Sequence, residues 1–348
     1  MKICFFGEKN KVLMYNIDKD EWKLTHLPFG QSYEFNYYSS AVTLPNGSIL
    51  ITGGGISNAV YQAFIVSSQN SNRLSVELVP KTPMNQTRKE HASVLLQNSV
   101  YVLGGYDGTL NSFLNSCERY DLETDEWKPV APMWIAKCAF GATTVANRYI
   151  FAVGGYDGHE RLNTIEKYDS KLDKWVLLDV QLKQPLSNSA CFAYSDNSIV
   201  ILGGGYNIGF CLEVNLLDIN TNEWKQLAPM NDGRDLRNKL VSINGNVYAI
   251  GGNNCLGEKY SIKKNEWTVV SSYQQLVNDN LDSWACALFY DLPGVKPPVV
   301  HNEELRSTST LKMYQQPQLI NQYQYYHYEE PYEEEVFSEQ SSTFEDWV

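Results

Sequence analysis

The chain has 348 residues, of which 43% are hydrophobic, and a formal net charge of −12. This length and composition allow a sizeable hydrophobic core, and the negative charge without a basic stripe argues against nucleic-acid binding. The sequence contains no run of about 18 apolar residues, so no membrane-spanning helix is predicted. The residues after Met1 lack the apolar segment of a secretory signal.

A strand-like segment and a hairpin pattern open the chain. Residues 3–7 are apolar and end in a glycine, and Tyr15 and Trp22 follow at a separation of seven residues. Polar residues between the two aromatics predict a tight turn that joins two strands. The same features return further along the chain, so this segment is interpreted as a fragment of a repeat.

Glycine pairs mark the complete repeats. Each pair ends a short run rich in β-branched or aromatic residues, which predicts a strand buried on both faces. A glycine pair at such a strand end indicates a crowded position with no room for side chains. The pairs recur at intervals of 48 to 51 residues and are Gly53 with Gly54, Gly104 with Gly105, Gly154 with Gly155, Gly203 with Gly204, and Gly251 with Gly252.

The Tyr–Trp hairpin pattern follows three of these glycine pairs. The aromatic residues keep the separation of seven and flank a polar turn, as in Tyr120 with Trp127, Tyr168 with Trp175, and Tyr260 with Trp267. Trp224 keeps the spacing with Leu217 in place of the tyrosine. Each repeat is therefore predicted to contain four short strands, the last two of which form this hairpin.

The repeat resembles the kelch repeat, in which a strand ends in Gly-Gly and a Tyr and a Trp follow. Two segments match that pattern in full, the one from Gly104 to Trp127 and the one from Gly154 to Trp175. The resemblance covers about residues 1–290 and implies that each repeat is one blade of a β-propeller.

A composite blade closes the predicted ring. Residues 284–290 have the character of a first strand that nothing follows, whereas the N-terminal fragment lacks its first strand. Joining them gives an all-β, six-bladed kelch-type β-propeller without free sheet edges at the closure. The expected propeller spans residues 1–290, with blades at 281–290 plus 1–24, 36–80, 89–131, 138–179, 188–228 and 236–270. The outer hairpin of the second blade is the least regular, because residues 61–79 lack the expected tryptophan.

The composition changes after residue 290. A linker rich in Pro and Gly at 291–298 precedes residues 301–348, which carry ten acidic and two basic side chains. We expect residues 291–348 to form a linker and a disordered, acidic, Tyr-rich tail. The aromatic residues among the acidic ones leave a second interpretation open, in which the tail folds onto a basic, partly apolar surface.

Candidate residues for catalysis or metal binding are sparse. No two histidines have metal-ligand spacing, and His26, His91 and His159 are expected to be solvated in or near loops. The seven cysteines include no Cys-x-x-Cys pair and are expected to be buried, reduced thiols. We therefore expect no enzyme activity, catalytic residue, metal or cofactor. A metal-dependent enzyme similar to galactose oxidase, a kelch propeller, stays an alternative, although its copper ligands cannot be placed on this sequence.

The resemblance implies that one face of the propeller binds a protein or peptide. In kelch propellers the loops after the glycine pairs and the links between blades share that face. The loop at residues 156–161 is the richest in aromatic and charged groups and is the first candidate. The expected binding residues are Tyr106, Asp107, Tyr156, Asp157, His159, Glu160, Arg161 and Tyr206 in loops, and Arg88, Arg234 and Arg237 in links.

The family resemblance also leads to expectations about the cellular role. Many kelch proteins carry BTB and BACK domains and recruit substrates to a ubiquitin ligase, whereas here the propeller is expected to begin at Met1. The chain is more similar to kelch proteins that act as cytoskeletal or ciliary adaptors. We expect a cytoplasmic scaffold, one subunit of a larger assembly with protein partners and no membrane. A substrate receptor that reaches a ligase through a separate subunit is the alternative.

Overall fold

The computed structural model describes residues 1–7, 10–27, 37–67, 74–206, 209–237, 239–251, 256–277, 281 and 283–289. The chain divides into two compact units, Met1–Pro297 and Pro298–Val348. The second unit lies outside the described residues, as do the predicted linker, Gly252 and residues 253–255. In the part of the chain that is described, no helix has the length and apolar character needed to cross a bilayer.

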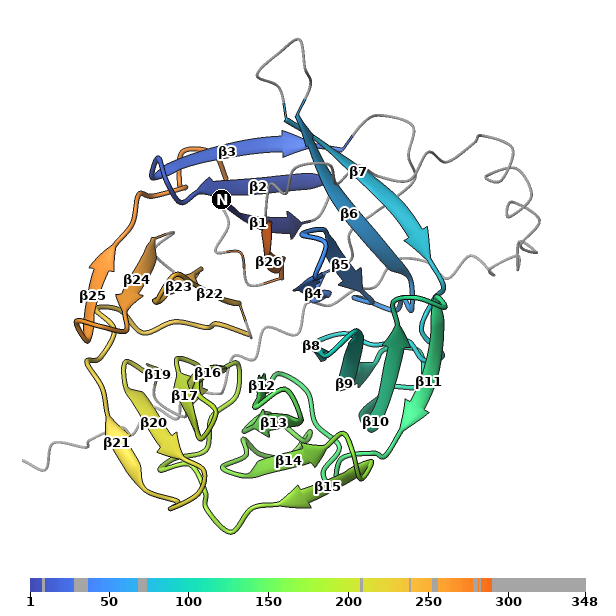
Figure 1. Cartoon of the computed structure of the whole chain (residues 1–348), viewed down its shortest axis with the longest axis vertical. Coiled ribbons are helices and arrows are strands. Elements are labelled where there is room, and N and C mark those ends of the chain that lie inside the picture. Colours follow the sequence, from blue (N-terminus) through green and yellow to red (C-terminus); the bar gives the residue numbers. More distant parts are fainter. Residues whose placement is uncertain are drawn as a thin grey trace, which may run out of the picture. The chain divides into compact units, whose positions relative to one another are not determined.

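Six four-stranded sheets, each a blade of antiparallel strands, are arranged around a centre (Figure 1). Blade 1 contains β26 (Ala285–Phe289), β1 (Lys2–Gly7), β2 (Lys11–Asn16) and β3 (Glu21–His26). Blade 2 contains β4 (Ser40–Thr43), β5 (Ile49–Thr52), β6 (Val60–Ser67) and β7 (Leu74–Lys81). Blade 3 contains β8 (Ala92–Leu96), β9 (Ser99–Asp107), β10 (Ser112–Asp121) and β11 (Glu126–Val130).

The remaining blades follow the same order from the inner to the outer strand. Blade 4 contains β12 (Gly141–Val145), β13 (Tyr149–Val153), β14 (Ile165–Asp169) and β15 (Lys174–Leu177). Blade 5 contains β16 (Ala190–Ser195), β17 (Ser198–Leu202), β20 (Val214–Asp218) and β21 (Trp224–Gln226), and a small hairpin of β18 (Gly205–Tyr206) and β19 (Gly209–Phe210). Blade 6 contains β22 (Leu240–Ile243), β23 (Asn246–Ile250), β24 (Gly257–Ser261) and β25 (Glu266–Val269).

The inner strands close the ring. Each one contacts the inner strands of both neighbouring blades, in the order β26, β4, β8, β12, β16, β22 and back to β26. β26 pairs antiparallel with β1, so that Lys2 lies opposite Phe289 and Phe6 opposite Ala285. The predicted six-bladed propeller and its closure by the C-terminal strand are confirmed.

The second strand of each blade lies between two layers of apolar side chains, because both faces of a blade touch a neighbour. β5 and β17 are accordingly buried at every position, as expected for continuous apolar runs. Between blades 3 and 4, for example, Tyr101 and Leu103 pack in one cluster with Ile150, Tyr168 and Trp175. The core is therefore a series of inter-blade layers.

The glycine pairs of blades 2 to 5 join each of these blades to the link that follows it. Gly105 donates its backbone N–H to the carbonyl of Lys137 at 2.9 Å, and Gly54 donates to the carbonyl of Arg88 at 2.8 Å. Gly105 has φ of +100°, and a Cβ there would lie 2.8 Å from the carbonyl oxygen of Lys89. Only glycine fits this backbone conformation and this close approach.

The Tyr–Trp pattern fastens the outer hairpins of blades 1, 3, 4 and 6 to the preceding link. Tyr120 lies directly opposite Trp127 in the β10–β11 ladder, and the Tyr120 hydroxyl donates to Asp125 in the turn. The Trp127 indole donates to the carbonyl of Thr82 at 2.8 Å, and the Thr82 amide donates to Asp125 at 3.1 Å. Blades 1, 4 and 6 make the same indole bond, through Trp22, Trp175 and Trp267.

Candidate functional site: the link face

The loops after the glycine pairs and the links between blades lie side by side on one face of the propeller, which we call the link face. Single β-bridges join a link residue to a residue that follows a glycine pair, as in Lys89 with Tyr106 and Cys138 with Tyr156. The predicted sharing of one face by these two kinds of segment agrees with these bridges.

A hydrogen-bonded arc of backbone surrounds the centre of the link face. Just before their inner strands, five residues take left-handed conformations with φ between 37° and 61°: Tyr38, Glu90, Ala139, Asn188 and Arg237. The amide of each donates to the carbonyl of its counterpart in the preceding blade, at 2.7–3.0 Å, beginning with Tyr38 N to Ser283 O. This axial arc holds backbone conformations that cost free energy in non-glycine residues. It therefore fixes the positions of the five Cα atoms from which the side chains extend.

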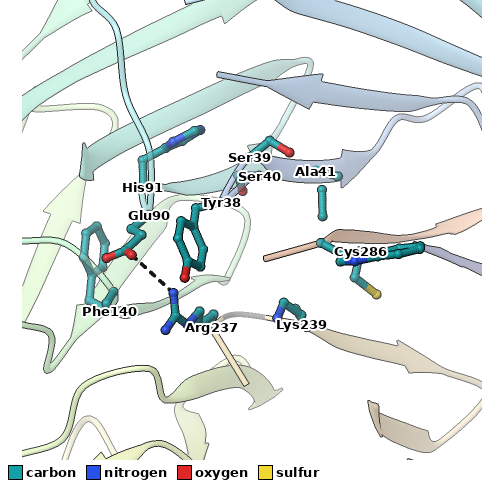
Figure 2. A pocket seen from close by; sticks show the side chains of 13 residues that line it. Tyr38, Ser39, Ser40, Ala41, Glu90, His91, Phe140, Arg237, Lys239 and Cys286 are labelled. Atoms are coloured by element: carbon teal, nitrogen blue, oxygen red, sulfur yellow. Dashed lines mark hydrogen bonds and ion pairs between the residues drawn. The ribbon is translucent and has the colours of Figure 1, made fainter. Parts of the chain in front are cut away.

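An ion pair spans the axis at the centre of the arc. Glu90 belongs to blade 3 and Arg237 to blade 6, on opposite sides of the ring, and the Arg237 Nη1 lies 3.2 Å from Glu90 Oε1 (Figure 2). Asp235 also contacts Arg237, at 3.0 Å, and the Arg237 guanidinium lies 4.5 Å from the ring centre of Tyr38. Burial lowers the pKa of Arg237, but the carboxylates of Asp235 and Glu90 outweigh it and raise the pKa.

Cys138 adds a neutral donor to the axial ion pair. Its Sγ lies 3.2 Å from Glu90 Oε2. Burial raises the pKa of the Cys138 thiol well above its ordinary value, and the charge of Glu90 raises it further. The thiol therefore stays protonated and donates to the carboxylate, and it is not a nucleophile at neutral pH.

The cavity beside the axial ion pair is too small for a drug-sized ligand. It has a volume of about 30 Å³ and is lined by residues such as Tyr38, His91, Phe140 and Cys286, whereas such ligands occupy about 300–1,000 Å³. Among the residues that the structure describes, no three His, Cys, Asp or Glu side chains gather where they could hold a metal ion.

An aromatic surface extends outward from the axis over blades 3 and 4. The rings of Tyr106 and Phe113 meet edge to face at 5.1 Å between centroids, and Phe113 meets Tyr156 at 5.8 Å. The Lys89 ammonium lies 5.2 Å from the ring centre of Tyr106 and 5.6 Å from that of Tyr37. We call these five residues the aromatic shelf.

Neighbouring loops interlock to form the shelf. A Cβ at Gly158 would lie 2.5 Å from Phe113 Cε2, so Phe113 rests directly on the blade-4 loop. A Cβ at Gly108 would lie 2.9 Å from Ile56 Cγ2, which places Ile56 of blade 2 on the blade-3 loop. Ile56 and Leu110 are 61% and 67% exposed. Loops of three consecutive blades thus contact one another on this face and carry exposed apolar side chains.

The predicted loop aspartates shape the loops. Asp157 Oδ1 accepts the amides of His159 and Glu160 at 2.8 and 2.9 Å. Asp107, which is buried, accepts the amide of Thr109 at 2.8 Å in the same way. His159 and Glu160 are exposed at the loop tip, and Arg161 pairs through its backbone with Tyr156.

Besides Asp107, two predicted binding residues in the links, Arg88 and Arg234, are buried, so their side chains are not available to a partner at the surface. The Arg88 guanidinium lies 2.8 Å from Glu118 in the interior and donates to the carbonyl of Gly104 at 2.9 Å. Arg234 pairs with Glu258 in the same way and donates to the carbonyl of Gly251. Both guanidinium groups hold the ends of glycine-bearing strands and face away from solvent.

The expectation of solvated histidines also fails for His91. Its side chain is buried, and its Nε2 lies 2.9 Å from the Thr52 hydroxyl. His26 and His159 are exposed, as expected. The cysteines that the structure describes are free thiols, and all except Cys286 are fully buried.

The structure brings together only part of the predicted set. Tyr106 and Tyr156 meet through Phe113, and Arg237 lies at the axis. Tyr206 packs against the cluster between blades 4 and 5 and is not part of the shelf. Sequence reasoning missed Phe113, because the β9–β10 hairpin is longer than the equivalent in other blades and reaches Asp107 and Ser112.

Comparisons with known proteins agree with this architecture. The family model described as the KLHDC2/KLHL20/DRC7 Kelch-repeats domain matches residues 41–252. The chain is 27% identical to Kelch-like protein 23 of Homo sapiens over 269 residues, which are 74% of this chain and 45% of the human protein. It is 31% identical to the Kelch repeat and BTB domain-containing protein F47D12.7 of Caenorhabditis elegans over 170 residues, which are 47% of this chain and 29% of that protein. The chain thus spans less than half the length of these relatives.

Proposed function

Since this chain belongs to the kelch-repeat family, whose propellers generally mediate protein interactions and are mostly non-enzymatic, we propose that its link face binds a partner protein through the aromatic shelf. The observation that carries this proposal is the exposed apolar surface built by interlocking loops of three consecutive blades. Aromatic side chains supply contact area with little loss of conformational freedom, which makes them frequent at the centres of interfaces. The partner is then a polypeptide laid over the shelf, between the blade-4 loop and the axis.

The proposal is tested with exposed residues whose substitution spares the fold. Leu110, in the loop between the shelf residues Tyr106 and Phe113, and Leu172, in the β14–β15 hairpin, are 67% and 68% exposed. We expect Leu110→Ser combined with Ile56→Ser to remove a defined set of proteins that co-purify with the full chain from its native cells. Leu172→Ser is the matched control and should retain that set. Equal recovery with both variants, measured by quantitative mass spectrometry, would contradict the shelf as the binding surface.

A ligase-associated role is the second candidate. The name of one relative joins kelch repeats to a BTB domain, and many kelch proteins with BTB domains recruit substrates to a ubiquitin ligase. Co-purification of a cullin-type scaffold with this chain would support the receptor role. If the scaffold no longer co-purifies with the Leu110→Ser, Ile56→Ser variant, then the protein bound at the shelf connects this chain to the scaffold. A cytoplasmic setting at the cytoskeleton or cilium is part of the first proposal, and fluorescent tagging of the native chain tests it.

A further inference from the structure

The outer edge of blade 4 carries an apolar surface separate from the aromatic shelf. Trp134, in the link that leads to this blade, is 66% exposed, and Val176 and Leu177 on β15 are exposed as well. The Trp134 indole Nε1 donates to the carbonyl of Trp175 at 3.0 Å, which places the indole at the edge of the outermost strand. We call Trp134, Val176 and Leu177 the blade-4 edge.

The other blades show that the fold does not require Trp134. In the links to blades 3 and 6 the equivalent residues are Asn85 and Asn231, whose side-chain amides donate to Glu118 and Glu258 at 2.6 and 2.7 Å. In blade 4 only the backbone N–H of Trp134 reaches the equivalent carboxylate, Glu166, at 2.7 Å. The indole is thus free of the internal role that asparagine serves elsewhere.

The same comparison shows that the edge of β15 lacks the protection found on other outer strands. The residue after the hairpin tryptophan is a lysine in blades 1, 3 and 5: Lys23, Lys128 and Lys225. Blade 3 adds Pro129, which has no N–H to offer. Lysine and proline are devices that keep edge strands from pairing with other chains. β15 has Val176 and Leu177 at these two positions.

The backbone of β15 is oriented to accept another strand. The Leu178 amide donates inward to the carbonyl of Ile165 at 2.9 Å, and Val176 lies opposite Lys167. Because backbone groups of an antiparallel edge strand alternate between the inside and the outside, the N–H and C=O of Leu177 point outward. The outward carbonyl of Trp175, which Trp134 contacts, fits this alternation. Among the described residues, none pairs with the outward groups of Leu177.

Charge and apolar character alternate along the strand as well. Lys174 and Val176 share one face of the sheet with Lys167 and Asp169, and the Asp169 carboxylate is paired with Arg148. Trp175 and Leu177 share the other face with Glu166, beside which Trp134 lies. We propose that the blade-4 edge binds an extended segment of a partner protein that adds a fifth strand to β15. The segment alternates apolar side chains, which pack on Trp134 and Leu177, with acidic side chains, which face Lys174 on the edge strand itself. Main-chain bonds supply affinity and the alternating side chains supply specificity.

Selection from a phage-displayed library of random 12-residue peptides on the full chain tests the proposal. Trp134→Asn installs the residue of blades 3 and 6, and Leu177→Pro installs the proline of blade 3, which removes one outward N–H. We expect selected peptides to alternate apolar and acidic residues, and each substitution to weaken their binding roughly tenfold or more. Hydrogen exchange should show the amides of Trp175 and Leu177 protected by the bound peptide.

Blade 6 provides the matched control. Val269, at the position of Leu177, is 57% exposed, and Asn231 stands there in place of Trp134. Thr268→Lys with Val269→Pro should leave peptide binding unchanged, and thermal unfolding verifies that every variant folds. If Leu177→Pro unfolds, Lys174→Glu replaces it, because a carboxylate at that position repels the acidic side chains of the peptide and should weaken binding. The proposal is overturned if no peptide is selected, if the peptides are basic, or if they ignore both substitutions. Sensitivity to Trp134→Asn without amide protection would also overturn it, since it means side-chain docking without a new strand.

Discussion

His91 lies beside the axial cavity with its imidazole buried and its Nε2 2.9 Å from the Thr52 hydroxyl. Burial, and secondarily the charge of Arg88, lower the pKa of His91 to about 3. The imidazole is therefore neutral at physiological pH and serves packing and hydrogen bonding with Thr52. A residue type that often serves catalysis is here part of the contact between blades 2 and 3.

Acid should destabilise the propeller through His91. The unfolded imidazole has a pKa of about 6.5, so between that pH and the folded value of about 3 the unfolded chain binds more protons. The stability that His91 contributes is complete above pH 6.5 and is lost as pH falls towards 3. His91→Gln should abolish about 2 kcal/mol of the stability lost between pH 7 and pH 5. Urea unfolding of both proteins at the two pH values measures this, and an unchanged loss in the variant would refute it.

At the scale of the blade, a buried ion pair recurs in blades 3, 4 and 6 and is replaced in blade 5. Arg88 pairs with Glu118, and Lys137 with Glu166 at 3.0 Å. In blade 5 the residue that accepts the amide of the preceding glycine pair is Leu186, and Asn215 stands two residues before Leu217, where blade 3 has Glu118 before Tyr120. Cation and carboxylate are thus present together or absent together, as the cost of an unpaired buried charge requires.

The blade-5 residues predict a compensated double substitution in blade 3. Arg88→Leu alone leaves Glu118 buried without its cation, and we expect it to lower the free energy of unfolding by about 3–5 kcal/mol. Glu118→Asn alone should lower the free energy of unfolding by a similar amount, because it leaves Arg88 buried without its carboxylate. The double variant should lose at least about 2 kcal/mol less than the sum of the single losses. Urea unfolding of the four proteins completes the cycle, and additive losses would show that the pair is not coupled.

The local repeat could be predicted from sequence because the glycine pairs and the Tyr–Trp hairpins act within one blade and the next link. The shelf was predicted only in Tyr106 and Tyr156, because Phe113, Lys89 and Tyr37 join it through contacts between blades that depend on loop length. Arg88 was predicted at the surface because its buried partner, Glu118, lies 30 residues away in sequence. The sequence does contain an indication of this ion pair: a cation in the link occurs together with a glutamate two residues before the hairpin tyrosine.

At the scale of the whole propeller, closure depends on one strand from the far end of the sequence. β26 pairs with β1, and its residues contribute to the clusters on both sides of blade 1: Leu288 packs with Phe5 and Tyr248, and Ala287 with Phe6 and Ile51. The strand therefore connects blades 6 and 2 as well as completing blade 1. Long-range pairing of this kind is slow to form but covers the edge that β1 would otherwise leave open.

Removal of β26 should therefore weaken the whole ring. A chain that ends at Ser283 lacks the strand, whereas a chain that ends at Pro297 keeps the entire first compact unit. We expect the shorter chain to unfold broadly at lower temperature and to associate through the exposed edge of β1. The longer chain should show one sharp transition. Calorimetry and size-exclusion chromatography compare them, and an equally sharp transition in both would contradict closure by β26.

The axial arc has an electrostatic consequence for the cavity that it borders. Its hydrogen bonds all run in the same direction around the axis, from Arg237 back to Ser283. In a helix, aligned peptide dipoles add up to partial charges at the two ends, whereas dipoles arranged head to tail around a circle follow one another and leave little net moment along its axis. The backbone therefore contributes little potential along the axis, and the field there depends on the charged side chains Glu90, Asp235, Arg237 and Lys239. Because these are two carboxylates and two cations, a single substitution among them changes the net charge at the centre while the arc of amides stays intact.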